Sequence, residues 1–159
     1  MKMPTTVRLT SLALLASLTI PTTYADTATA TFTVTATVLN TCSATATNLG
    51  FGTYVNVTID STSTVSVTCT SGGTYTVGLS NGANYSAPNR RMTNGSAFLT
   101  YELYSDAGRL TVWNDTTTVA GTGSGLAQGL TVYGRLPGTQ GLIAGSYTDT
   151  ITATVTYTP

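Results

Sequence analysis

Few side chains in this sequence are suited to chemistry. It contains two cysteines, Cys42 and Cys69, and no histidine, so the thiols lack the usual partner for a metal site or for nucleophilic catalysis. Two cysteines in an oxidising compartment instead indicate one disulfide. In the chain-entropy model, closing a loop of about 27 residues stabilises the fold by roughly 3.5 kcal/mol. We therefore expect a disulfide between Cys42 and Cys69, no metal and no cofactor.

The carboxylates offer little for acid–base catalysis. Glu102 and Asp106 could act as acid and base if folding brought them together around a cleft. The single lysine is Lys2, however, and no nucleophile motif is recognisable. We expect no catalytic residues and no enzymatic activity.

Arg90, Arg91 and Trp113 have both a binding and a structural interpretation. The arginines could contact an anion or a carbohydrate, and the indole could stack on a sugar. Arginines in a loop more often cap carbonyls or pack on rings, and a lone tryptophan is more often an anchor in the core or at its rim. The glycine-rich residues 121–125 have no following helix and no lysine, so we expect a flexible loop there and no phosphate site or other bound small molecule.

The N-terminal residues have the pattern of a secretory signal peptide. Lys2 and Arg8 supply a positive start, and residues 9–20 are apolar and uncharged. That apolar run is too short to span a bilayer comfortably, although an uncleaved anchor is the alternative. We expect residues 1–25 to be removed, so that the exported chain begins at Asp26.

The predicted mature chain carries few charges. Removing residues 1–25 leaves four arginines and six acidic residues, a net charge of about −2 without a cluster of either sign. An electrostatic footprint for nucleic acid or an anionic membrane is therefore absent. A surface built mainly from Thr, Ser, Asn and Gly suits a protein that assembles.

Alternation of apolar and polar residues dominates the mature chain, and no segment has helical periodicity. Turn-forming residues separate the alternating segments, with longer loops expected at 80–96 and 114–129. The expected strands are at 28–38, 65–69, 75–79, 99–103, 110–112, 130–132 and 151–157. Short strands at this spacing predict a single all-β domain, an immunoglobulin-like β-sandwich, over residues 40–159.

This sandwich is expected to be incomplete. The last strand runs to the final residue, which leaves one strand too few, an unpaired edge and an open core. Donor-strand complementation would fill the gap with an extended segment of another copy, and residues 26–39 are a natural donor. From alternation alone, these residues could equally be the first strand of their own domain. The donor side chains would be Ala30, Phe32, Val34, Ala36 and Val38, and the acceptor groove would be faced by Ile151, Ala153, Val155 and Tyr157.

Seven short motifs follow one another in a recognisable order. They are NLGFGTY at 48–54, VSVTCT at 65–70, RRM at 90–92, LTYELY at 99–104, VW at 112–113, LTVYGR at 130–135 and AGSYTDT at 144–150. Together they resemble the spore coat protein U domain, which is shared with major subunits of archaic chaperone–usher pili. The resemblance covers essentially the whole mature chain, from about residue 41 to residue 157.

The resemblance implies an incomplete immunoglobulin-like sandwich exported through the periplasm. A chaperone would lend a strand there, and an outer-membrane usher would pass subunits into a homopolymeric surface fibre that supports adhesion and biofilm formation. It also implies that residues 26–39 are the donor strand. The alternatives are a spore or cyst coat protein and a monomeric, secreted, carbohydrate-binding adhesin.

Overall fold

The computed structural model describes residues 21, 23–141 and 143–159, and most of the predicted signal peptide lies outside them. The chain forms two units, residues 1–36 and 37–159. In the first unit the described residues form neither helix nor strand, and their side chains are exposed, with Phe32 at 87% and Val34 at 81%. The expected strand at 28–38 is therefore not paired in either sheet of this single chain.

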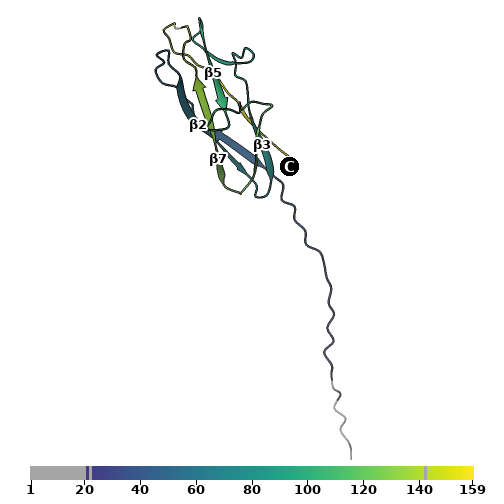
Figure 1. Ribbon diagram of the computed structural model, residues 1–159. Coiled ribbons are helices and arrows are strands. Elements are labelled where there is room, and N and C mark those ends of the chain that lie inside the picture. The colour runs from purple at the N-terminus through teal and green to yellow at the C-terminus, as the bar shows by residue number, and fades with distance from the viewer. Residues whose placement is uncertain (1–20, 22, 142) are drawn as a thin grey trace, which may run out of the picture. The chain divides into compact units, whose positions relative to one another are not determined.

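The second unit is a β-sandwich with no helix among its described residues. One sheet has the order β1-β2-β7-β5-β4 and the other the order β6-β3-β8, and every ladder is antiparallel. Figure 1 shows β2 and β7 side by side, with β3 in the other sheet. The strands are β1 (Cys42–Ala46), β2 (Ile59–Cys69), β3 (Thr74–Leu79), β4 (Arg90–Thr93), β5 (Phe98–Tyr104), β6 (Val119–Thr122), β7 (Ala127–Leu136) and β8 (Ala153–Tyr157). The predicted all-β, immunoglobulin-like sandwich is confirmed.

The core is built from the alternation that the sequence displays. In β5, Leu99, Tyr101 and Leu103 are buried, while the residues between them are only half-buried. Because successive side chains of a strand point to opposite faces, one face of each sheet supplies the core and the threonines supply the other. The buried hydrophobic residues are Val65, Val67, Cys69, Tyr75, Val77, Leu79, Leu99, Tyr101, Leu103, Trp113, Val132 and Leu136.

The expected strand at 110–112 is wrong. Leu110 is 87% exposed, and the Asp106 carboxylate accepts hydrogen bonds from the backbone N–H groups of Leu110 at 3.1 Å and Thr111 at 2.7 Å. These bonds fold residues 106–111 into a turn, and pairing is limited to an isolated bridge between Tyr104 and Val112. Hydrogen bonds to the Asp106 side chain therefore decide the backbone conformation here, and the short alternation of apolar and polar residues at 110–112 does not.

Three short strands were missed by the sequence analysis. β4 lies inside the loop expected at 80–96 and β6 inside the loop expected at 114–129. Each has four residues and little apolar content, and it exists because a longer neighbour offers a free edge. β1 consists mainly of small and polar residues and is held by pairing with β2.

Candidate functional site

An open groove leads from the surface into the core of the sandwich. One part, of about 470 Å³, is bounded by residues 46–49 and 147–149, and the core residues Tyr101, Leu103 and Val132 line its floor. A second part, of about 890 Å³, is bounded by residues 49–54 and 143–147. The two parts share Leu49, Phe51, Met92 and Tyr147, so they form one continuous depression, called the groove below.

The NLGFGTY motif builds one wall of the groove. The Phe51 ring meets Tyr101 edge-on, with centroids 6.1 Å apart. A Cβ at Gly134 in β7 would collide with Leu49 and press on Phe51, so this glycine makes room for the wall. The Ser61 hydroxyl donates to the carbonyl of Gly50 at 2.8 Å and fixes the segment to β2. The motif therefore turns apolar side chains toward the core without covering it.

The opposite wall ends in the unpaired edge of β8. Thr152 bonds Ser80 through both backbone groups, because its carbonyl accepts from the Ser80 N–H at 2.8 Å and its N–H donates to the Ser80 hydroxyl at 2.9 Å. Backbone groups of successive residues in a strand point to alternate sides. Those of Ile151, Ala153 and Val155 therefore point away from β3, toward an edge that no described residue pairs.

Asn40 lies where β8 ends, beyond the residues that line the groove. Its side-chain amide donates to the carbonyls of Thr158 at 3.1 Å and Thr74 at 3.3 Å, which joins the ends of β8 and β3. Gly73 has no side chain where the Asn40 side chain lies.

The disulfide is formed between Cys42 and Cys69, which are direct partners in the β1–β2 ladder, as the sequence predicts.

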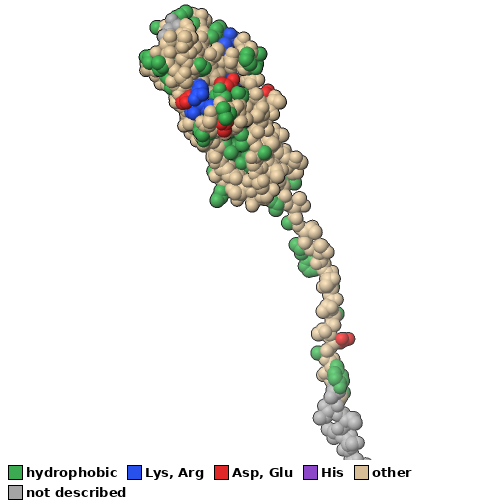
Figure 2. Space-filling view, in the orientation of Figure 1, with side chains coloured by type: hydrophobic (Ala, Val, Ile, Leu, Met, Phe, Trp, Pro, Cys, Tyr) green, Lys and Arg blue, Asp and Glu red, His purple; other side chains and the backbone are tan. Residues whose placement is uncertain are grey.

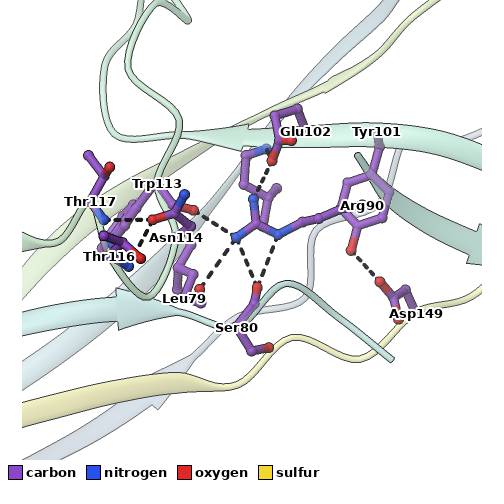
Figure 3. A network of polar contacts seen from close by, with 11 residues as sticks. Leu79, Ser80, Arg90, Tyr101, Glu102, Trp113, Asn114, Thr116, Thr117 and Asp149 are labelled. Carbon is purple, nitrogen blue, oxygen red and sulfur yellow. Dashed lines mark hydrogen bonds and ion pairs between the residues drawn. The ribbon is translucent and has the colours of Figure 1, made fainter. Parts of the chain in front are cut away.

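Figure 3 shows a buried polar cluster around Arg90, which is 1% exposed. Its guanidinium pairs with Glu102 and donates to the carbonyls of Ser80 at 2.9 Å and Trp113 at 2.8 Å. Trp113 is fully buried, and its indole N–H donates to the carbonyl of Val77 at 2.8 Å. These contacts tie β4 and β5 to β3 across the sandwich. They agree with the structural interpretation of both residues and leave neither exposed to a soluble anion or sugar.

The remaining candidates for chemistry do not come together. Glu102 is paired with Arg90, whereas Asp106 is occupied by backbone N–H groups of its own turn, which hold the pKa of its carboxyl below the usual range. Arg91 donates to the carbonyl of Asn84 at 2.9 Å and lies 4.3 Å above the centre of the Phe98 ring. No group of metal-ligating side chains occurs among the residues that the structure describes.

The glycine-rich residues 121–125 are not a free loop, which corrects the sequence prediction. Gly121 and Thr122 belong to β6. Gly123 exchanges backbone hydrogen bonds with the β2–β3 turn, donating to Gly73 at 2.7 Å and accepting from Gly72 at 2.9 Å. A Cβ at Gly123 would collide with the backbone of Thr70 and Cys69, so this glycine allows the two turns to pack.

A neutral phenol lines the groove. The Tyr101 hydroxyl donates to the Asp149 carboxylate at 2.7 Å, and burial together with that carboxylate raises the pKa of Tyr101 well above its ordinary value. The other Asp149 oxygen accepts from the backbone N–H of Ala83 at 2.9 Å. The groove therefore presents apolar walls with a few satisfied polar groups, which suits a strand rather than a charged ligand.

The predicted acceptor residues occupy different places. Ile151 and Ala153 line the groove, and Val155 packs on the core beside it. Tyr157 is 37% exposed and lines a shallow depression with residues of β3 and β6. Sequence reasoning missed Leu49, Phe51, Met92 and Tyr147 as lining residues, although the NLGFGTY motif marked two of them.

The predicted donor residues are all available for contact. All five are exposed and belong to no strand: Ala30, Phe32, Val34, Ala36 and Val38.

Among the described residues, no helix is long and apolar enough to cross a membrane.

Comparisons with known proteins agree with this architecture. A family model, the Spore Coat Protein U domain, matches residues 28–154. Protein U of Myxococcus xanthus is 37% identical over 127 residues, which cover 69% of this chain and 71% of that protein. A chain in the crystal structure of the CsuC–CsuE chaperone–tip adhesion subunit pre-assembly complex, from the archaic chaperone-usher Csu pili of Acinetobacter baumannii, is also similar. Its TM-score is 0.58 at 25% identity, and the match covers 75% of this chain and 40% of that chain.

Proposed function

Because the chain belongs to the spore coat protein U domain family, we propose that it is a structural subunit of a secreted surface fibre that polymerises by donor-strand complementation. The likeness to a chaperone-usher pilus complex supports a pilus-type subunit and a structural role instead of a catalytic one. The mature protein would begin near Asp26, pass through the periplasm and end in a fibre at the cell surface.

The groove beside the unpaired edge of β8 is the observation that carries this proposal. The apolar walls of the groove, such as Phe51 and Ile151, are only half-buried, which is expected where a sandwich lacks a strand. The free backbone groups of Ile151, Ala153 and Val155 offer the ladder for that strand. An added strand would pair with β8 and bury apolar side chains against Phe51 and Leu103. Each large apolar side chain so buried contributes about 1.5 to 3 kcal/mol before the cost of ordering.

Residues 26–39 have the properties of the missing strand. Phe32, Val34 and Val38 alternate with threonines and are each more than 80% exposed. Residues 28–38 and residues 147–157 are equal in number, and at about 3.3 Å per residue each extends for about 33 Å. A donor of residues 28–38 is thus long enough to run beside β8 and the residues from 147 onward that precede it.

Assembly of such a subunit needs a temporary partner. The similar solved chain comes from a complex of a chaperone with a tip adhesion subunit before assembly. By analogy, a periplasmic chaperone would lend this chain a strand until an outer-membrane usher exchanges it for the donor of the next subunit. Adhesion and biofilm formation are the roles proposed for the fibre. A spore or cyst coat is the second candidate, because the matching family is described by its coat proteins.

The test compares the native size of three proteins: the mature chain, a variant lacking residues 26–38, and a variant carrying that segment behind Pro159 on a short flexible linker. We expect ladders that resist cold detergent from the first, no ladder from the second and a stable monomer from the third. A Phe32→Asp variant should abolish the ladder, whereas Thr33→Asp, one residue away on the other face, should retain it. A mature chain that is already a well-folded monomer would contradict the proposal.

A further inference from the structure

Three apolar side chains stand exposed at the end of the sandwich where residues 143–147 bound the groove. They are Val55 at 65%, Val57 at 56% and Ile143 at 54% exposed, and they are called the rim below. In Figure 2, separate hydrophobic patches interrupt the otherwise polar surface of the domain. Apolar side chains grouped beside a binding groove are typical of a contact surface.

The rim is held in place by its own backbone. Asn56, between the two valines, has a φ of 64°, a left-handed conformation that is uncommon for a residue with a side chain. It is held there because the N–H of Thr139 donates to its carbonyl at 3.1 Å and the N–H of Gln140 donates to its side-chain oxygen at 2.8 Å. The backbone carbonyl of Ile143 accepts a hydrogen bond from the Tyr147 hydroxyl at 2.8 Å. The valines are therefore presented outward by an ordered loop.

A second apolar pair lies at the opposite end of the sandwich. Leu39 is 60% and Leu126 is 73% exposed, and they are called the base below. The Thr70 hydroxyl donates to the carbonyl of Leu39 at 3.2 Å, and the Gly125 N–H donates to the carbonyl of Cys69 at 3.1 Å. Both leucines thus lie at the β2–β3 turn, where Asn40 binds Thr158.

The direction of the donor strand decides which ends of two copies meet. All ladders of the domain are antiparallel, and antiparallel pairing is slightly more stable per residue. β8 runs from the rim end to the base end, so an antiparallel donor starts at the base end of the acceptor and finishes at its rim. The next residue of the donor copy is Leu39, which belongs to its base. A parallel donor would instead bring two bases together.

We propose that the rim of one copy binds the base of the next, as a second apolar contact between successive subunits of the fibre. This contact rests on the proposed donor-strand exchange and completes its geometry. Because rim and base are different surfaces on opposite ends, the contact is heterologous and can repeat from copy to copy along a fibre, unlike the self-complementary contact of a two-fold dimer. Its occupant is a second copy of this chain.

The experiment joins surface cysteines in assembled protein. Val55→Cys protein is mixed with Leu126→Cys protein, allowed to polymerise and treated with a short bis-maleimide, which leaves the native disulfide intact. Leu110→Cys mixed with Leu126→Cys is the matched control. Leu110 is 87% exposed on the turn between Tyr104 and Val112, and Tyr104 pairs with Tyr133 within β7 rather than at either end of that strand. A rim and a base that touch within one fibre meet at an effective concentration in the millimolar range. The control cysteines are held apart within a fibre and meet only between fibres, at the micromolar concentration of the protein, so the rim–base pair should crosslink about a thousandfold faster.

The outcomes separate the two proposals. Rapid crosslinking of the rim–base pair, absent when the donor segment has been moved behind Pro159, supports the contact. Ladders that form while the rim–base pair crosslinks no faster than the control overturn the contact and leave the fibre intact. Preferential crosslinking of Leu126→Cys to itself overturns it in favour of a parallel donor. A chain that does not polymerise at all overturns both proposals.

Discussion

Replacing Arg90 by methionine should destabilise the domain severely, although Arg90 lies outside the groove. The side chain is 1% exposed, and its partner Glu102 is 16% exposed. Methionine is unbranched like arginine but shorter, and it donates no hydrogen bond. The Glu102 carboxylate and the carbonyls of Ser80 and Trp113 would therefore lose their donor inside the sandwich. Removing one member of a buried ion pair costs about 3 to 5 kcal/mol. Total stabilities of domains are about 5 to 15 kcal/mol, so this is a large share.

Thermal unfolding followed by circular dichroism measures the effect. For a domain of this size the loss corresponds to a fall in Tm of roughly 10 to 20 °C. Arg91→Met is the matched control, because Arg91 adjoins Arg90 but makes a partly exposed contact with Asn84 and Phe98 that is worth about 1 kcal/mol or less. The double variant R90M/E102L should recover part of the loss, because it removes the unpaired charge. Equal losses in Arg90→Met and Arg91→Met would refute this account of the buried cluster.

Three further outcomes are expected. Reducing the Cys42–Cys69 disulfide should lower the free energy of unfolding by about 3.5 kcal/mol, and urea titrations that coincide with and without reductant would contradict this. The hydrogen bond from Arg135 holds the pKa of Asp60 below its usual range, so its stabilisation is complete above about pH 4 and is lost as the pH falls through the folded-state pKa. Because the pair is exposed to solvent, its contribution to the free energy of unfolding is about 1 kcal/mol at most. Asp60→Asn should therefore remove a loss of stability of that size from the acid side of a curve of stability against pH. Trp113→Phe should cost about 2 to 4 kcal/mol in urea titrations, from lost volume and a lost hydrogen bond, and a loss below 1 kcal/mol would argue against its anchoring role.

Local patterns accounted for the long strands, because burial on one face leaves a visible period of two. Residues 65–69, 99–103 and 130–132 were predicted as strands and lie within β2, β5 and β7. Leu110 and Val112 show the same pattern over too short a length, and the Asp106 turn decides their conformation. Short edge strands such as β4 carry no period of their own, because they form on an edge supplied by a neighbour.

The candidate site, like the fold, was only partly predictable from the sequence. Composition and spacing alone indicated an all-β domain with one disulfide, and an alternating segment at 28–38 that could be a donor strand or the first strand of its own domain. Only the tertiary structure located the groove, because its walls come from residues 49–54 and 143–147, which are distant in sequence and meet when the two sheets pack. It also decided that Arg90 and Trp113 are internal ties rather than a binding surface, since burial depends on which strands cross above a residue. Alternation with a period of two shows in the sequence which face of a strand is apolar. Which strand edge stays unpaired depends instead on the order of all the strands in the folded sheets, and no local pattern contains that order.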